Sequence, residues 1–370
     1  MKFAVSTKPL QDGINLGIVN SNISEFYQKS KIAQISVTAN NLVINLEARS
    51  IKTEIRLKGQ PAGGESAIIS VESTLFKRLV STLTTAAVEF EFTADTLVLH
   101  SGKSKFTLPK IVDNNEVELN KPAEPNTATL SSAADLDKSD WKFVQNHQMY
   151  AKSDSIVNPV FTYVWVGENG DVMTGDYINS MFTLSTGNKL GDTCLLEESI
   201  LNLFLALPDG AKIVKLGESY LVSVVTDSFE YITEFMPKYE NEQNGNYNAP
   251  MIKETMIANP DDGIKVKVAS VSTILNQATL FVNKKDPTIF CTVSGNQIVF
   301  KDGGNVDCSI QAENESRLTY SIKFNLDFLK SMINKSSEDV ITLYPAVNNN
   351  EVVGIIVSSG RLTAILAGAE

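Results

Sequence analysis

Three stretches of the sequence share one pattern of apolar residues: VESTLFKRLV (71–80), LEESILNLFL (196–205) and FNLDFLKSMI (324–333). Each has apolar side chains at its first, fifth, sixth, ninth and tenth positions, which is one face of an α-helix. The stretches lie about 125 residues apart, a spacing that indicates an internal repeat. We therefore predict three equivalent helices. Polar residues that suit helix starts stand near the beginning of each one, at Ser73, Ser199 and Asp327.

The surroundings of the three helices also repeat. Each is preceded by a predicted β-hairpin with alternating apolar residues around an Asn- or Gly-rich turn, at 38–57, 166–185 and 293–312. A further predicted helix precedes each hairpin, at 8–20, 138–152 and 271–283. Two or three β runs follow each second helix. The sequence thus predicts an α+β fold of three tandem units, each with an antiparallel sheet and two helices.

Two polar stretches mark the boundaries of these units. Residues 114–135 are rich in Asn, Pro, Ala and Ser, and residues 239–262 form a polar, partly acidic run. Both compositions are typical of linkers. We predict three domains, covering residues 1–122, 130–256 and 257–370.

Composition limits the class of protein. Apolar residues make up 43% of the 370 residues, which is enough for ordinary cores. No apolar run is long enough to span a bilayer, and the N-terminal residues lack the apolar run of a signal peptide, so a cytoplasmic protein without membrane contact is expected. The net charge of −11 argues against a uniformly basic surface, but it allows an acidic exterior around a local basic stripe.

Residues that carry chemistry are scarce. The three cysteines are widely spaced and are interpreted as buried, reduced thiols: Cys194, Cys291 and Cys308. The chain has only two histidines, and no phosphate-binding loop, dinucleotide fingerprint or nucleophile elbow is present. We expect no metal, no cofactor and no catalytic site.

Four local strings carry a resemblance to a known family. The chain begins Met-Lys-Phe; SGKSKFTL (101–108) is similar to the string S-G-R-S-R-F-S-L of that family, FMPKY (235–239) to its F-P-D-Y element, and FVNKK (281–285) to its L-S-N-E-K segment. With the threefold repeat, these strings resemble the bacterial-type DNA polymerase III β subunit, the β sliding clamp. Two stretches depart from it: residues 174–181 lack the expected Arg, and residues 364–370 lack the expected Pro. A divergent clamp, such as a viral one, would show these departures.

The resemblance implies a fold and a function. The fold would be three clamp domains forming half of a closed ring. The function would be that of a processivity factor, a homodimer that encircles duplex DNA without reading its sequence. An ATP-driven clamp loader would load it onto primed DNA, where it would tether the replicative polymerase. An alternative is a non-enzymatic, structural β-rich repeat protein, such as a virion or surface module. A basic stripe on the helices would favour the clamp, and scattered lysines would favour the alternative.

The resemblance also implies three groups of site residues. In a clamp, outward-facing polar residues of the helices touch phosphates, which here would be Lys8, Gln11, Lys77, Arg78, Lys138, Lys142, Asn146, Gln277 and Lys330. The interface between two copies would join Lys103, Lys105, Phe106 and Leu108 to Leu280, Phe281, Glu313 and Glu315. A groove for short partner peptides would contain Gly175, Met181, Pro237, Tyr239, Ile365 and Leu366. For each group the simpler interpretation is a solvated helix face, a lysine-guarded edge strand, or ordinary core and loop residues.

Overall fold

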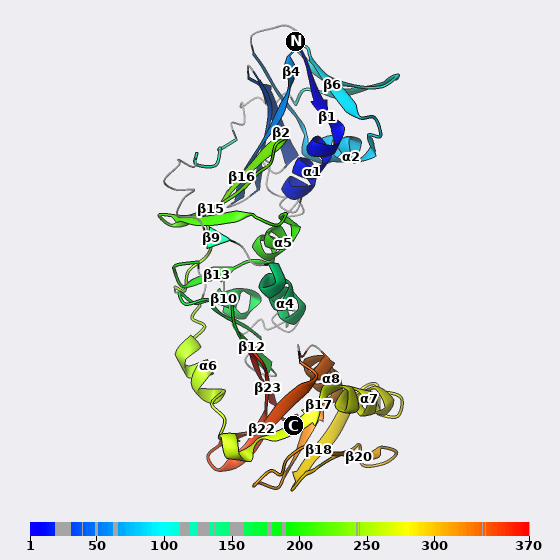
Figure 1. Cartoon of the computed structure of the whole chain (residues 1–370), viewed down its shortest axis with the longest axis vertical. Coiled ribbons are helices and arrows are strands. Elements are labelled where there is room, and N and C mark those ends of the chain that lie inside the picture. The colour runs from blue at the N-terminus through cyan, green and yellow to red at the C-terminus, as the bar shows by residue number, and fades with distance from the viewer. Residues whose placement is uncertain are drawn as a thin grey trace. The chain divides into compact units, whose positions relative to one another are not determined.

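The computed structural model of the chain describes residues 1–18, 31–38, 40–48, 51–61, 66–111, 119–124, 134–135, 138–148, 159–175, 180–186, 190–241, 243, 245–334, 336 and 338–369. It divides into two compact units (Figure 1). The first comprises Met1–Trp141 with Leu196–Lys238, and the second comprises Lys142–Leu195 with Tyr239–Glu370. Among the described residues, no helix is long and apolar enough to cross a membrane.

The order of helices and strands repeats three times. One strand, a helix, four strands, a second helix and three strands follow one another in each repeat. The first repeat contains β1 (Lys2–Ser6), α1 (Thr7–Ile18), β2 (Ile32–Val37), β3 (Asn41–Ala48), β4 (Ile51–Pro61), β5 (Ala67–Glu72), α2 (Ser73–Thr82), β6 (Ala87–Phe92), β7 (Thr96–Ser101) and β8 (Ser104–Pro109).

The second and third repeats contain the equivalent elements. The second has β9 (Ala134–Asp135), α4 (Lys138–Gln148), β10 (Val164–Val166), β11 (Asp171–Gly175), β12 (Ser180–Ser185), β13 (Cys194–Leu196), α5 (Glu198–Ala206), β14 (Lys212–Leu216), β15 (Ser219–Val225) and β16 (Phe229–Phe235). The third has β17 (Ile264–Lys267), α7 (Val268–Ala278), β18 (Thr288–Ser294), β19 (Gln297–Lys301), β20 (Asp307–Gln311), β21 (Tyr320–Asn325), α8 (Leu326–Asn334), β22 (Val340–Asn348), β23 (Glu351–Ser359) and β24 (Leu362–Ala367). The predicted α+β class with antiparallel sheets is confirmed, while the three domain boundaries stay a prediction.

The first unit is built on one large antiparallel sheet. Its main path runs β8-β7-β6-β1-β4-β16-β15-β14-β9, and β2, β3 and β5 branch from β4. Along this path, β4 of the first repeat pairs with the whole length of β16 of the second, from Ile51–Phe235 to Leu57–Phe229. The sheet is therefore continuous across two repeats. Helix α1 packs on this junction, where Gly13 leaves room for the Ile55 side chain.

The second unit contains two sheets. The larger has the order β13-β10-β11-β12-β24-β23-β22-β17, and the smaller has the order β20-β19-β18-β21. Here β12 of the second repeat pairs with β24 of the third, from Leu184–Leu362 to Ser180–Leu366. Helices α7 and α8 pack together over a core that both sheets share, with Val271, Leu275, Leu329 and Ile333 among its buried residues.

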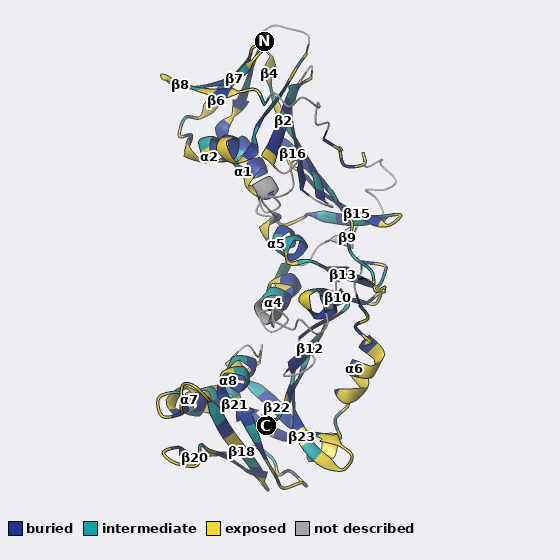
Figure 2. Cartoon of the chain, turned by 180° about the vertical axis from the view of Figure 1, so that it is seen from behind, coloured by how far each residue is buried: buried dark blue, intermediate teal, exposed yellow. Residues whose placement is uncertain are grey.

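One helix was not predicted from the sequence. Within the stretch interpreted as a polar linker, α6 covers Ala249–Thr255 and a 3₁₀ turn covers Pro260–Asp262. Most of α6 is exposed (Figure 2), but Ile252 is fully buried against the second unit. The helix was missed because seven residues with only two buried ones, Ala249 and Ile252, are too few to give an apolar periodicity.

The apolar face predicted for the first of the three equivalent helices is partly wrong. Val71 ends β5, and the helix α2 starts at Ser73, capped by Glu72, whose carboxylate accepts the backbone N–H groups of Thr74 and Leu75. The buried stripe is Ser73, Phe76, Lys77 and Val80, while Leu75 is 47% exposed. Lys77, not Leu75, therefore faces the interior of the first unit.

Candidate functional site

The predicted DNA contacts of α1 and α2 fall into different environments. Lys8 is exposed, and its Nζ lies 3.0 Å from Asp12 Oδ1 one turn away. Arg78 is exposed. The Gln11 side chain is hydrogen-bonded within the protein, because its Nε2 donates to the carbonyls of Val80 (3.0 Å) and Leu83 (2.9 Å) at the end of α2. This side chain donates to two carbonyls at the C-terminal end of α2 and so links the two helices.

Lys77 does not lie on the surface. Its side chain is buried, with 5% of the residue exposed, and within the described residues Nζ has no hydrogen-bonding partner. Desolvation lowers the pKa of Lys77 to about 8, partly opposed by the negative charge of Glu72. In this structure its charge is not presented to a ligand outside the helix.

The remaining helical candidates lie on α4, α7 and α8. Lys142 and Gln277 are exposed. Lys138 Nζ lies 3.7 Å from Asp209 Oδ1, and half-buried Lys330 donates from Nζ to Thr279 Oγ1 at 3.4 Å. The side chain of Asn146 lies outside the described residues.

The candidate interface residues lie on and around two edge strands. Among the described strands, β8 pairs only with β7, and β20 pairs only with β19. Near β8, Lys103 and Lys105 are exposed, Phe106 is half-buried and Leu108 is buried. In β20, Cys308 is half-buried, which departs from the expectation that all three thiols are buried; Cys194 and Cys291 are buried.

The third-repeat edge carries the opposite charge. Asp307 in β20 is exposed, and so are Glu313 and Glu315, which follow this strand. Leu280 and Phe281, just after α7, are 79% and 57% exposed, which is unusual for such large apolar side chains. Each edge therefore presents backbone groups that no strand of the described chain pairs, together with partly exposed apolar residues. Strand β8 and the turn before it carry exposed lysines, and β20 and the residues after it carry exposed carboxylates, of which Asp307 lies 3.0 Å from Lys301 Nζ.

Three groove candidates lie in one row across neighbouring strands. Gly175 of β11 pairs with Met181 of β12, which pairs with Ile365 of β24. Only glycine fits at position 175, because φ is +151° and an added Cβ would lie 2.3 Å from the Ser180 carbonyl oxygen.

The apolar part of this row is already covered by the chain itself. Met181 is 3% exposed and packs in a cluster with Trp165, Tyr247, Ile252 and Met256. The Leu366 side chain belongs to the main core of the second unit instead. Pro237 is buried in the first unit, and Tyr239 is half-buried in the second.

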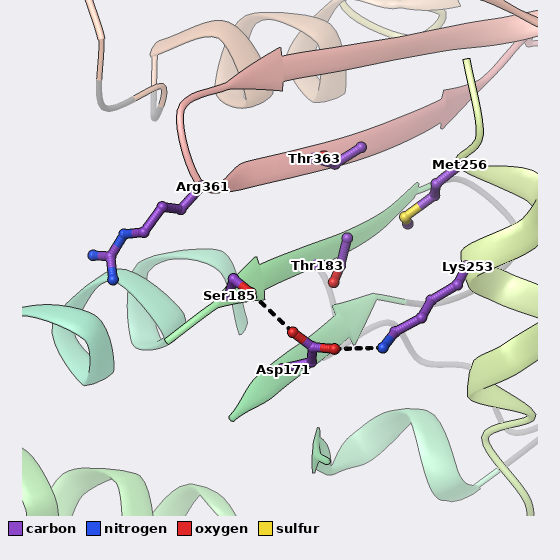
Figure 3. Close-up of a pocket in the computed structure, with 7 residues that line it drawn as sticks. All are labelled: Asp171, Thr183, Ser185, Lys253, Met256, Arg361 and Thr363. Atoms are coloured by element: carbon purple, nitrogen blue, oxygen red, sulfur yellow. Dashed lines mark hydrogen bonds and ion pairs between the residues drawn. The ribbon is translucent and has the colours of Figure 1, made fainter. Parts of the chain in front are cut away.

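A cavity of about 320 Å³ opens on the same strands, next to the row (Figure 3). Its lining residues are Asp171, Thr183, Ser185, Lys253, Met256, Arg361 and Thr363. Asp171 accepts hydrogen bonds from Lys253 Nζ (2.5 Å) and Ser185 Oγ (2.9 Å), and the bond from Lys253 is the main reason that the pKa of Asp171 is lowered. The sequence gives no signal for this cavity, since sheet pairing assembles it from distant segments.

No arrangement typical of a metal centre is seen in the described part of the chain, where no three His, Cys, Asp or Glu side chains are grouped to hold an ion. His100 of β7 lies beside Glu91 of β6, with Nε2 and Oε2 2.7 Å apart. The hydrogen bond to His100 is the largest cause of the lowered pKa of Glu91. We interpret this pair as a cross-strand contact that stabilises the sheet.

Comparisons with solved structures identify the fold. The chain matches a putative DNA polymerase III beta subunit of Eubacterium rectale over 100% of both chains, with a TM-score of 0.79 and 16% identity. It matches the DNA polymerase III beta subunit of Thermotoga maritima over 100% of this chain and 99% of that one, with a TM-score of 0.76 and 14% identity. The chain has the sliding-clamp fold.

A third match adds a ligand-bound example of this fold. The Helicobacter pylori beta clamp bound to a DNA ligase peptide covers 100% of both chains, with a TM-score of 0.74 and 13% identity. No family model and no curated protein matches the sequence. At these identities the sliding-clamp fold has been kept while most of the side chains have changed.

Proposed function

We propose that this protein is a DNA sliding clamp, a non-catalytic homodimeric ring that encircles duplex DNA and holds the replicative polymerase on it. The observation that carries the proposal is the sliding-clamp fold over the full length of the chain. In the proposed ring each chain supplies three clamp domains. The alternative, a structural repeat protein of a virion or surface, has no comparable support.

The pairing of equivalent strands supports ring closure. β4, β12 and β20 are equivalent, because each is the third of the four strands between the two helices of its repeat. β8, β16 and β24 are equivalent, because each is the last strand of its repeat. Within the chain, β4 pairs with β16 and β12 pairs with β24. The same rule pairs β20 with a β8, and both lie at sheet edges in the part of the chain that the structure describes. We propose that β20 of one copy pairs with β8 of the next, which removes both edges.

The β4–β16 and β12–β24 junctions also predict which residues would pair in the proposed β20–β8 junction. In the first, Leu42, Leu57 and Phe229 form a row, and in the second Val172, Leu184 and Leu362 do. The equivalent row across the interface is Ile298, Ile310 and Ser104 of the neighbouring copy. Two residues further along, Cys308 then lies opposite Phe106. Both are half-buried in a single chain, so pairing would shield two partly exposed apolar side chains together.

The proposed DNA contacts are few and non-specific. Lys8, Arg78, Lys142 and Gln277 present exposed polar ends on the helices, and such side chains contact phosphates without reading bases. The proposed partners are the polymerase, a clamp loader and short peptide segments. The match to a Helicobacter pylori clamp bound to a DNA ligase peptide supports a peptide partner, and the proposed place for it is the row of Gly175, Met181 and Ile365.

A cross-linking experiment tests the ring and its register. Phe106→Cys places a thiol opposite the native Cys308 of the neighbouring copy, at a cross-strand spacing that a disulfide can bridge. We expect oxidation to give a covalent dimer with both interfaces closed, visible by non-reducing electrophoresis. Phe106→Cys with Cys308→Ser is the matched control and should stay uncross-linked.

The same variant tests the function without a loader. Oxidised in the presence of closed circular DNA, the Phe106→Cys protein should remain on that DNA at high salt and leave when the DNA is linearised or the disulfide is reduced. A protein that is strictly monomeric at micromolar concentration, or that leaves circular and linear DNA equally after cross-linking, would exclude the ring.

A further inference from the structure

Strand β17 stands at one end of the larger sheet of the second unit, where a strand ordinarily leaves an open edge. Among the described strands it pairs only with β22. Three backbone groups in and just before β17 nevertheless bond to residues outside this sheet: the Gly263 carbonyl, the Lys265 N–H and the Lys265 carbonyl. Their partners are Glu313 and Asn314, which follow β20 of the smaller sheet.

The Asn314 side chain takes the place of a peptide group in a neighbouring strand. Its Oδ1 accepts from the Lys265 N–H at 2.6 Å, and its Nδ2 donates to the Gly263 carbonyl at 2.7 Å. Beside it, the backbone N–H of Glu313 donates to the Lys265 carbonyl at 2.9 Å. A primary amide can make such a pair of bonds because it carries an acceptor and a donor, as the backbone peptide does. The edge of β17 is thereby closed.

The chain on either side of Asn314 is anchored as well. The N–H groups of Ala312 and Ser316 donate to carbonyls in the turn between β18 and β19, both at 2.8 Å. The Ser316 hydroxyl donates to the Asp262 carbonyl at 3.2 Å. The residues that follow β20 are therefore fixed both to the end of their own sheet and to the edge of the larger one.

Side chains in this segment alternate between the protein and the solvent. Asn314 is half-buried and Ser316 is buried, whereas Glu313 and Glu315 are exposed. This alternation is that of an extended chain. The inward side chains hold the segment, and the outward ones present two carboxylates next to the edge strand β20.

We propose that Asn314 is a positioning residue of the interface between two copies. Its amide bonds within its own chain, and it acts by holding the Glu313 carboxylate where a lysine of the neighbouring copy reaches it. In the register proposed above, Lys103 of that copy lies opposite Gln311, so Glu313 lies diagonally across from it. An opposite-charge pair at this place favours the β20–β8 orientation over others. The role of Asn314 rests on the proposed ring.

Two substitutions test the bonds of the Asn314 amide. Asn314→Leu keeps the approximate size of the side chain and removes both bonds, whereas Asn314→Asp keeps an acceptor for Lys265 but sets a carboxylate against the Gly263 carbonyl. The exposed Asn296, in the turn between β18 and β19, provides the control Asn296→Asp, which adds the same charge nearby. In analytical ultracentrifugation we expect both Asn314 variants to weaken dimerisation by about fivefold or more, and the control to change it by less than about twofold.

Amide hydrogen exchange tests the contact between Asn314 and β17 directly. The Lys265 N–H bonds to the Asn314 side chain, so it should be protected in the wild-type protein. Its exchange should become about tenfold faster or more in Asn314→Leu and stay unchanged in Asn296→Asp. NMR measures this in a monomer as well as in a dimer.

A double-mutant cycle distinguishes positioning from general stability. Glu313→Gln should weaken dimerisation about threefold in the wild-type protein and should have no further effect in Asn314→Leu, where the carboxylate is no longer held. An unprotected Lys265 amide, an unchanged dimer affinity in Asn314→Leu, or a full Glu313→Gln effect in that variant would overturn the role of Asn314 and leave the ring standing. A strictly monomeric wild-type protein with a protected Lys265 amide would overturn the ring, and the interface role with it.

Discussion

Lys77 is the residue whose environment contrasts most strongly with its chemistry. An ammonium group taken out of water without a partner destabilises the folded state, because the charged form loses its hydration. The protein responds by lowering the pKa of Lys77 to about 8 from the ordinary 10.5. Near neutral pH the group is still charged in both states, so the full cost of burying that charge is present there.

Replacing Lys77 by methionine should stabilise the protein. Methionine keeps the apolar stem and removes the charge, so we expect a gain of about 1–3 kcal/mol in the free energy of unfolding at pH 7. The measurement is urea denaturation followed by circular dichroism. The control is Arg78→Met, an exposed neighbour on α2, which should change stability by less than about 0.5 kcal/mol.

The pH dependence gives a second check on the same residue. Because the folded-state pKa lies below the unfolded one, the unfolded chain binds more protons between pH 8 and 10.5, and stability contributed by this group rises with pH across that window. Lys77→Met should lack this rise. An identical pH profile in the two proteins would contradict the assigned burial.

At the scale of elements, β8 and β20 are complementary in charge as well as in position. In the proposed register, Lys105 of β8 lies diagonally across from Asp307 of β20, and both are exposed in the single chain. Such cross-strand pairs contribute to affinity modestly and to orientation strongly.

A charge exchange should reveal this pair. Lys105→Glu places like charges together and should weaken dimerisation about five- to tenfold, by about 1 kcal/mol or slightly more. Combining it with Asp307→Lys should restore most of the loss. Analytical ultracentrifugation measures both. If the double variant is as weak as the sum of its single variants, the two residues do not meet.

The elements could largely be predicted from the sequence, and the site only in part. The stripe in 196–205 and 324–333 survives in α5 and α8 because burial on a sheet demands one continuous apolar face. The cavity could not be predicted, since strand pairing and the position of α6 bring its lining residues, among them Asp171, Lys253 and Arg361, together from distant segments. The burial of Lys77 could not be predicted either, since it depends on which face of α2 packs against the first unit.

At the scale of the whole molecule, the net charge of −11 and the few exposed helical cations indicate weak binding to DNA. Lys8, Arg78 and Lys142 are the exposed cations among the proposed contacts, and Lys8 is shared with Asp12. A ring does not need strong contacts, because its linkage to circular DNA is topological.

The salt dependence of the affinity for DNA should show that the contacts are few. With about three phosphate contacts per chain, the slope of log affinity for linear duplex against log salt should be about −5 or shallower for the dimer. Arg78→Ala with Lys142→Ala should flatten it by about 3, while Lys265→Ala, on an exposed strand position, should not. Fluorescence anisotropy measures the slopes. A steeper slope that is insensitive to Arg78 and Lys142 would place the DNA contacts elsewhere.

The sharing of strands between repeats also has a mechanical consequence. The β4–β16 junction runs the full length of β16, the β12–β24 junction is shorter, and chain continuity backs up both. A β20–β8 junction between copies would rest on a short strand with no covalent link across it. If an outward force acts on such a ring, the β20–β8 interface between copies breaks before the junctions inside each chain. A protein that opens the ring therefore has to break the hydrogen bonds of one short strand pair only. Each chain stays folded and can form the ring again.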